Sequence, residues 1–240
     1  MRSNLYALHG FLGKPHEWDN FLTPDHNKIA IDPYSIISPS QQCCQNTWAT
    51  KFNAHVHHQN LQHKPILMGY SMGGRVAMHA LLQAPEKWAG AIFISAHPGL
   101  PDLQTCEKRL IHDCAWADRF EKEEWNALMH DWNSQLALKF DEPIVRYEKD
   151  YTRKGCSDTL RYWSLGKQKS FSQKLSQLPM PILWVAGEKD ASYVAIAKEM
   201  NFAHQQSQVW IAPEVAHRVP WACKNLFQKK LQEFLKAIQR

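Results

Sequence analysis

The sequence of 240 residues contains no long uninterrupted hydrophobic run. A transmembrane helix needs about 18 or more consecutive apolar residues, and no segment approaches that length. The stretch at residues 5–12 is too short and too polar for the apolar core of a signal peptide. We therefore expect a cytoplasmic protein that does not bind a membrane.

Cysteine is also sparse, and its spacing suits neither a disulfide framework nor a redox motif. Two of the six cysteines, Cys43 and Cys44, are adjacent and cannot pair comfortably, and no C-x-x-C pair occurs. Reduced thiols are the simplest state for such a set. The sequence also lacks internal repeats and low-complexity tracts.

Histidine is plentiful, but the sequence lacks the pattern of a metal site. His55, His57, His58 and His63 lie close together, and the aspartates that a metallo-hydrolase would interleave with them are absent. A solvated helix face accounts for this cluster. We therefore expect no bound metal, and we expect no organic cofactor.

Charge is nearly balanced, with a formal net charge of +5 spread along the chain. The densest basic cluster, Lys229 and Lys230, fits the solvated face of a C-terminal helix. A basic stripe with aromatic or groove-reading elements is missing, so the sequence predicts no nucleic-acid partner.

Hydrophobic residues make up 44% of the chain, enough for one full core. Helical stretches separate several segments that are typical of strands, and this alternation predicts an α/β fold, a mostly parallel sheet flanked by helices. The expected strands are residues 4–8, 28–31, 65–68, 89–95, 181–186 and 208–212. An amphipathic helix should begin near Ala222, with Phe227, Leu231, Phe234 and Leu235 on one face.

The interval from about residue 100 to residue 178 interrupts this alternation, because it is rich in helix formers and aromatics and poor in strand signals. We interpret it as a helical lid inserted into a single domain. The core would then consist of residues 1–99 and 179–240, with the lid at 100–178. Most lid aromatics should form the lid's own core.

Residues 69–73 read Gly-Tyr-Ser-Met-Gly between an apolar run and an amphipathic helical pattern. Strand, G-x-S-x-G and helix in this order indicate a nucleophile elbow, so Ser71 is the candidate nucleophile. Flanking glycines are needed because so tight a turn strains the serine backbone and leaves no room for neighbouring side chains. The elbow places the hydroxyl at a helix N-terminus, where developing negative charge is favoured.

The elbow belongs with an acid and then a histidine further along the chain. Asp190 follows the expected strand 181–186 and is the natural acid, with Glu188 as its competitor. His217 lies in the loop after the last expected strand, where the base belongs. The backbone N–H groups of Phe11 and Met72 would form the oxyanion hole.

Arg75 follows Ser71 by four positions on the same helix, so both side chains project from nearly the same face. A guanidinium binds a carboxylate through two parallel hydrogen bonds, which indicates an anionic substrate. The alternative is a salt bridge to an acid of the lid.

These residues resemble the α/β-hydrolase superfamily over nearly the whole chain. The resemblance rests on His9-Gly10-Phe11, the elbow, Gly187-x-x-Asp190 and His217. Gly73-Gly74-Arg75, His97-Pro98-Gly99-Leu100 and Arg109 with Asp113, Trp116 and Phe120 resemble one branch more narrowly. That branch is 2-succinyl-6-hydroxy-2,4-cyclohexadiene-1-carboxylate synthase, an enzyme of menaquinone biosynthesis that eliminates pyruvate.

The narrower resemblance implies that Arg75, Arg109 and Arg161 bind the carboxylates of a polyanionic substrate. It also makes Trp132 a lid residue of the pocket, and Tyr70 a further substrate-binding candidate. The sequence departs from the superfamily at residues 32–35, which read Asp-Pro-Tyr-Ser instead of a glycine-rich turn. It departs again at Ala216, where a glycine usually precedes the histidine.

Two reactions suit this set of residues. In the first, Ser71 activated by His217 removes a proton and the enol of pyruvate leaves. In the second, the same groups hydrolyse a carboxylic ester, such as the methyl ester of a pimeloyl carrier protein. The arginines favour the elimination, so we expect a lyase with a small anionic substrate, as a monomer or small homo-oligomer. A non-catalytic binding protein would have no need of all three triad residues.

Overall fold

The computed structural model describes residues 3–21, 23–40, 42–57 and 63–238. Six strands form one sheet with neighbouring strands parallel, in the order β2-β1-β3-β4-β5-β6. The strands are β1 (Ser3–Leu8), β2 (His26–Ile31), β3 (Ile66–Tyr70), β4 (Gly90–Ile94), β5 (Ile182–Gly187) and β6 (Gln208–Ala212). The predicted parallel sheet is confirmed.

The central strands β3, β4 and β5 are buried along their whole length. Strands covered on both faces need continuous apolar runs, which is why these segments could be recognised in the sequence. Strand β3 continues two residues beyond the expected end, since Gly69 and Tyr70 pair with Phe93 and Ile94 of β4. The first half of the elbow motif is thus strand, not turn.

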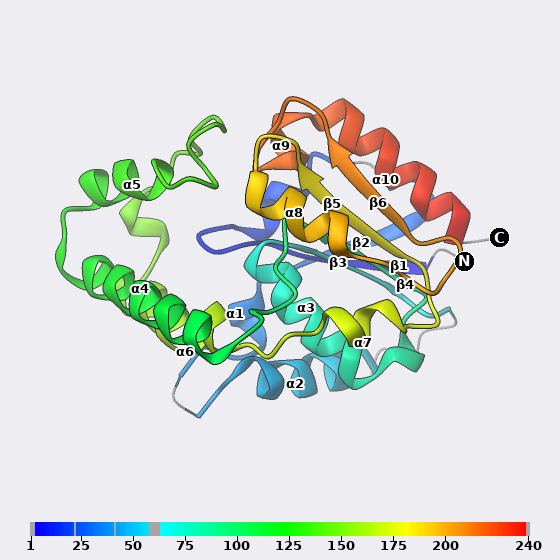
Figure 1. The fold of residues 1–240 in the computed structure, drawn as a ribbon, viewed down its shortest axis with the longest axis horizontal. Helices are drawn as coiled ribbons and strands as arrows, with labels where there is room; N and C mark the ends of the chain where they lie inside the picture. Colours follow the sequence, from blue (N-terminus) through cyan, green and yellow to red (C-terminus); the bar gives the residue numbers. More distant parts are fainter. Residues whose placement is uncertain (1–2, 22, 41, 58–62, 239–240) are drawn as a thin grey trace.

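Helices cover both faces of the sheet (Figure 1). Helix α10 (Lys224–Ile238) covers one face, where its four predicted apolar residues are buried with strand residues and with Trp18 of the short helix η1 (Pro15–Trp18). The short helix α9 (Val219–Ala222) precedes it and buries Val219 in the same cluster.

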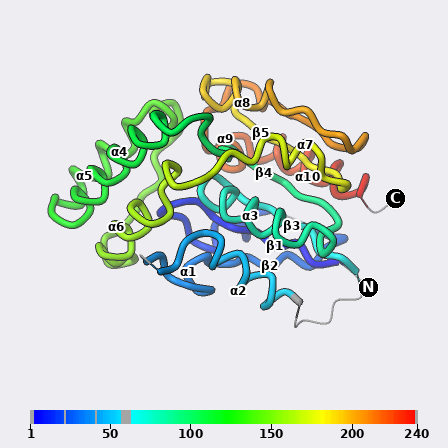
Figure 2. The backbone as a smooth tube through the Cα atoms, turned by 60° about the horizontal axis from the view of Figure 1, so that its bottom comes forward, coloured from blue at the N-terminus to red at the C-terminus, as the bar shows by residue number. Residues whose placement is uncertain are grey.

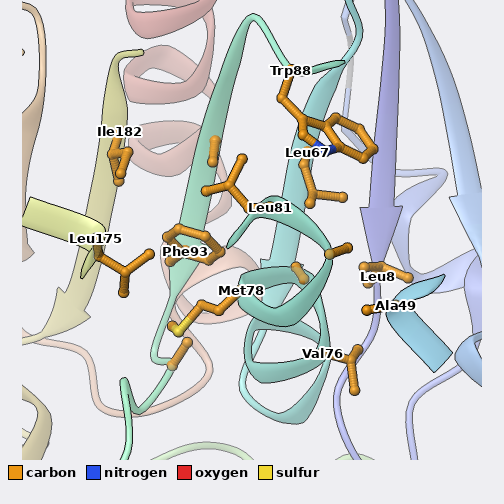
Figure 3. Close-up of a cluster of buried hydrophobic side chains, with 14 of the residues drawn as sticks. Leu8, Ala49, Leu67, Val76, Met78, Leu81, Trp88, Phe93, Leu175 and Ile182 are labelled. Carbon is orange, nitrogen blue, oxygen red and sulfur yellow. The ribbon is translucent and has the colours of Figure 1, made fainter. Parts of the chain in front are cut away.

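The other face carries α1 (Pro33–Ile36), α2 (Gln45–His57), α3 (Met72–Gln83), α7 (Ser172–Ser176) and α8 (Ala191–Glu199). Figure 3 shows how α3 packs there, with Val76, Met78 and Leu81 directed toward Leu8 and Phe93 of the sheet. A short helix, η2 (Pro85–Lys87), follows α3. The nucleophile helix is therefore held by a dense apolar layer.

Three helices between β4 and β5 form the lid: α4 (Leu103–Lys122), α5 (Trp125–Asn133) and α6 (Arg153–Tyr162). Figures 1 and 2 show them together beyond one end of the sheet. Trp116, Phe120 and Trp125 are buried in a separate cluster that also contains Leu12 from the loop after β1. The lid core therefore rests on the loop that carries Phe11. Short helices η3 (Glu148–Asp150) and η4 (Leu165–Lys167) complete this region.

The strand order reverses between β1 and β3, because β2 lies outside β1 and the later strands lie on the other side of β3. In open α/β sheets, ligands bind outside the carboxyl ends of the strands at such a reversal. Here the loop carrying Phe11 follows β1 and Ser71 follows β3. The topology thus brings the two candidate segments together.

Candidate active site

Ser71 lies between β3 and α3 with backbone angles φ 52° and ψ −116°. A non-glycine residue with positive φ is strained and must be held by its surroundings. The N–H of Ser71 donates to the backbone oxygen of Ile94 at 2.8 Å, which anchors the turn to β4. A Cβ atom on Gly69 would lie 2.6 Å from the backbone of Gly73 and Gly74, so strand and helix can approach this closely only with glycine there.

Ser71, His217 and Asp190 lie in one hydrogen-bonded row. The Nε2 atom of His217 is 3.0 Å from the Oγ atom of Ser71, and its Nδ1 atom is 2.8 Å from the Oδ2 atom of Asp190. His217 and Asp190 are both buried. With Nδ1–H donating to the carboxylate, Nε2 is free to accept the serine proton.

The competing acid, Glu188, points elsewhere. It is exposed, and its Oε2 atom accepts a hydrogen bond from the N–H of Glu214 at 2.9 Å. Asp190 instead caps the start of α8, where its Oδ1 atom faces the N–H of Tyr193. Of the two candidates, Asp190 is the one in contact with His217.

Two further residues, Ser95 and Tyr193, contact His217. The sequence did not point to either of them. The buried hydroxyl of Ser95, just after β4, donates to the backbone oxygen of His217 at 2.7 Å. The ring of Tyr193 packs edge-on against the imidazole at 4.7 Å between centroids. Ser95 could have been sought at the end of a strand, but nothing in the sequence marks Tyr193 as a neighbour of the histidine.

Phe11 and Met72 lie beside Ser71, and all three line the same small cavity. Met72 is the first residue of α3, and the first N–H groups of a helix have no acceptor within it. A Cβ atom on Gly73 would lie 2.3 Å from the backbone oxygen of His9, so the first turn of α3 touches the loop after β1 directly. The two candidate oxyanion donors therefore belong to segments in van der Waals contact.

His9 itself is buried, and its ring contacts the loop rather than Ser71. Its Nδ1 atom lies 2.8 Å from the backbone oxygen of Gly10, and its Nε2 atom lies 3.4 Å from Asp32. Asp32 also caps α1, where it accepts from the N–H of Tyr34 at 2.9 Å. The unusual turn at residues 32–35 thus contacts the loop after β1 through Asp32 and His9.

Two cavities meet at Ser71. The larger has a volume of about 400 Å³ and is also lined by His217, Tyr70 and Trp132. The smaller has a volume of about 100 Å³ and is lined by Arg75 and by Asp113. Arg109 and Trp132 line both.

Arg75 is half-buried, and its guanidinium binds neutral oxygens. It donates to the backbone oxygen of Trp163 at 2.7 Å and to the side chain of Gln168 at 3.4 Å. The predicted alternative, a salt bridge to a lid acid, is not among the ion pairs of the described residues. Burial, and less strongly the charge of Arg109, lowers the pKa of Arg75 to about 10, so the side chain remains charged at neutral pH.

Arg109 and Trp132 come from the lid. Arg109 pairs with Asp113 at 2.8 Å and keeps about two fifths of its side-chain surface exposed (41%). The ring of Trp132 lies 5.0 Å from the rings of both Phe11 and Trp116. Tyr70 faces the larger cavity from β3, with its ring 5.5 Å from that of His217. All three residues therefore border the space above Ser71.

Arg161 does not join this group. It pairs with Asp118 and Glu121 of α4 and lines neither of the two cavities at Ser71. Because α4 packs against α6, the acids of one helix face the arginine of the other. The structure therefore does not bring Arg161, the third arginine that the resemblance implied, to the cavities at Ser71, and its charge instead faces the acids of the neighbouring lid helix.

The structure offers no metal site among the residues that it describes. Of the histidine cluster, His55 and His57 lie at the end of α2, His63 lies beyond that helix, and His58 lies outside the described residues. Within the described ranges, no helix is long and apolar enough to cross a bilayer.

Comparison with known proteins places the chain in a family. The family model described as Serine aminopeptidase, S33 matches residues 49–220. A 2-succinyl-6-hydroxy-2,4-cyclohexadiene-1-carboxylate synthase from Serratia proteamaculans is 29% identical, over 96% of this chain and 92% of that protein. The synthase of the same name from Klebsiella pneumoniae is 30% identical, over 82% of this chain and 81% of that protein.

Among solved structures, MenH from S. aureus aligns with a TM-score of 0.88 and 22% identity, covering 99% of this chain and 95% of that one. At this identity the likeness shows the fold. The chain thus belongs to the Serine aminopeptidase S33 family of α/β-hydrolases and, by its similarity to the curated relatives, to the family of the 2-succinyl-6-hydroxy-2,4-cyclohexadiene-1-carboxylate synthases.

Proposed function

We propose that the protein is a lyase that eliminates pyruvate to form 2-succinyl-6-hydroxy-2,4-cyclohexadiene-1-carboxylate, a step of menaquinone biosynthesis. The observation that carries this proposal is Arg75, a half-buried cation with neutral partners, one helical turn from Ser71. A desolvated guanidinium of this kind is costly unless an anion binds to it. The relatives that carry the synthase name supply the identity of that anion.

The substrate offers three carboxylates. The name of the product contains a ring carboxylate and the carboxylate of the succinyl arm, and the departing pyruvate carries the third. The smaller cavity, with Arg75 and Arg109, has room for one carboxylate-bearing arm. The larger cavity can hold the six-membered ring above Ser71.

In this proposal the Ser71 oxygen takes a proton from the ring carbon that bears the succinyl ketone, and His217 accepts the serine proton. The C–H electron pair becomes part of the new diene, the bond between the ring carbon and the oxygen of the three-carbon group breaks, and the departing enolate of pyruvate takes the proton from His217 to leave as the enol. Negative charge collects transiently on the ketone oxygen, where the N–H groups of Phe11 and Met72 would stabilise it. No water is consumed, and no covalent bond forms between Ser71 and the substrate.

Asp190 holds the imidazole with Nδ1–H toward its carboxylate and offsets the charge that His217 gains. Ser95 and Tyr193 fix the loop and the ring from two other sides. We propose that these contacts hold the imidazole of His217 in place, so that it can accept the Ser71 proton without moving.

The experiment that tests the proposal is a pyruvate-release assay on the enolpyruvyl precursor. Ser71→Ala, Asp190→Asn and His217→Ala should each lower kcat by about 10³-fold or more, and combined variants should lose little further, because the three residues act as a unit. Absence of pyruvate release by the wild-type protein would overturn the lyase assignment.

A carboxylesterase is the second candidate, because the same three residues at 2.8 and 3.0 Å are equally suited to acyl transfer. The two mechanisms differ in covalent chemistry. An esterase forms an acyl-enzyme on Ser71 and shows a burst of the first product. Mass spectrometry of the intact protein during turnover should show no adduct if elimination is the reaction.

A further inference from the structure

The arginines of the described residues fall into two groups. The larger group pairs with carboxylates and consists of Arg109, Arg119, Arg146, Arg153 and Arg161. The other group, Arg75 and Arg218, takes part in none of the ion pairs among the described residues. Both of these side chains line a cavity at Ser71, Arg75 the smaller and Arg218 the larger.

Arg218 directly follows His217 and is 8% exposed. Its guanidinium donates to the backbone oxygen of Glu142 at 2.9 Å and to the side-chain oxygen of Asn133 at 2.5 Å. Both acceptors are neutral, so the guanidinium forms no direct ion pair with a carboxylate of the described residues. A charge in this state is costly, and an anionic group in the cavity would compensate it.

Two acids, Asp141 and Glu17, lie near this charge and partly offset it, but neither accepts a hydrogen bond from the guanidinium. Asp141 accepts from the backbone N–H of Arg218 at 2.9 Å rather than from its guanidinium. Glu17 pairs with Arg146, which lines the same cavity. The guanidinium of Arg218 uses two of its five N–H groups in these hydrogen bonds, which leaves donors for a ligand.

We propose that Arg218 binds a carboxylate of the substrate in the larger cavity, across Ser71 from Arg75. This inference rests on the proposed function, in which the substrate carries three carboxylates. Arg75 and Arg109 suit one of them in the smaller cavity, and Arg161, the third arginine that the family resemblance implied, lies outside both cavities. In this chain Arg218 would take the role of the third arginine, and it comes from the loop that carries His217 instead of from the lid.

The test uses an unreactive probe, benzene-1,3,5-tricarboxylate, titrated into the full-length protein by calorimetry. Arg218→Gln should weaken its binding by about 10- to 100-fold, the loss expected for a charged hydrogen-bonded pair. Arg218→Lys should lie between Gln and wild type, because an ammonium restores the charge without the planar fork. Benzoate, with a single carboxylate, should bind both variants as it binds the wild type.

Two matched variants separate recognition from structure. Arg119→Gln removes a paired lid arginine that lines neither cavity and should leave tricarboxylate binding unchanged. Asn133→Ala removes one hydrogen bond from Arg218 but keeps its charge, so tricarboxylate binding should persist. If Asn133→Ala and Arg218→Gln weaken tricarboxylate binding equally, the role of Arg218 is only to hold the end of α5 and the segment after it in place. That result would overturn the proposal.

The probe also separates this proposal from the proposed function. Tricarboxylate binding that depends on Arg218 in a protein that releases no pyruvate would support the anion site and reject the lyase. Normal pyruvate release with unchanged tricarboxylate binding in Arg218→Gln would retain the lyase and reject the anion site.

Discussion

Arg75 and Arg161 are both charged, both lie on helices, and differ in what surrounds them. Arg75 projects from α3 toward Ser71 and meets the carbonyl oxygen of Trp163. Arg161 meets Asp118 and Glu121, which neutralise it. Two bound carboxylates neutralise a guanidinium, so its attraction for an anionic ligand is weak. A guanidinium bound only to neutral oxygens keeps most of its attraction for an anion.

This difference leads to a prediction on single arginines. Arg75→Ala should lower kcat/KM for the tricarboxylate substrate by about 10- to 150-fold, since a charged hydrogen bond contributes about 1.5–3 kcal/mol. Arg75→Lys should recover little of this loss. Arg161→Ala should remain close to wild type in the pyruvate-release assay. An equal loss in Arg161→Ala would show that the two lid helices rearrange to present that side chain to the substrate.

Sequence reasoning reached Arg75 because the four-residue spacing from Ser71 is a local property of a helix. It could not exclude Arg161, since that requires knowing that α4 packs against α6. It also passed over Arg218, although this residue directly follows His217. Whether such a neighbour points into the pocket depends on the backbone of the loop, which no periodicity describes.

At the scale of elements, the end of β5 and the loop of His217 share a tight contact. A Cβ atom on Gly187 would lie 1.8 Å from the backbone oxygen of Ala216. Next to it, the N–H of Lys189 donates to the backbone oxygen of Val215 at 2.8 Å. The loops that carry Asp190 and His217 are therefore joined through their backbones, and only glycine fits between them.

Gly187→Ala should push this loop outward and lower both stability and turnover. A displacement of about 1 Å at a catalytic group can cost about 10²-fold in rate, so we expect kcat to fall by about that factor. Ala216→Gly, which restores the residue common in the superfamily, should fold and turn over nearly normally. Thermal melts and pyruvate release on the two variants check this, and a fully active Gly187→Ala would contradict the contact.

The elements themselves were largely predictable. Residues 208–212 form β6 as expected, and the C-terminal helix buries the four apolar residues assigned to it. These patterns repeat every two or every 3.6 residues and carry their own signal. The lid was predicted only as helical, because its aromatics show no period that reveals how α4, α5 and α6 pack.

At the scale of the whole molecule, the buried His79 and the half-buried His97 couple stability to pH. Burial, and less strongly Arg75, lowers the pKa of His79 to about 3. Burial, with Arg109 and Arg75 as smaller causes, lowers the pKa of His97 to about 4. His79 lies on α3 against Phe171, and His97 lines the larger cavity. Both imidazoles are therefore neutral in the folded protein at neutral pH.

Unfolding releases these histidines to an ordinary pKa of about 6.5. Below that pH the unfolded state binds protons that the folded state does not. The contribution of these two histidines to the free energy of unfolding is therefore fully present above pH 6.5 and is lost as the pH falls toward 4. The slope should be about 1.4 kcal/mol per pH unit for each histidine. His79→Gln should flatten the fall of Tm between pH 6.5 and 4, and the exposed His16→Gln should leave it unchanged. Identical curves for all three proteins would contradict the assignment.

The contact of Gly73 with the backbone oxygen of His9 bears on when the site forms relative to substrate binding. Because the first turn of α3 touches the loop after β1, we expect Phe11 and Met72 to keep their mutual distance when a ligand binds, while Phe11 also packs against Phe120 and Trp132 of the lid. In the proposed function, the two candidate oxyanion donors would therefore be in place before any ligand arrives. Mixing enzyme with substrate should therefore give steady turnover from the first cycle, without a lag, and any slow phase at the start would originate in the lid alone.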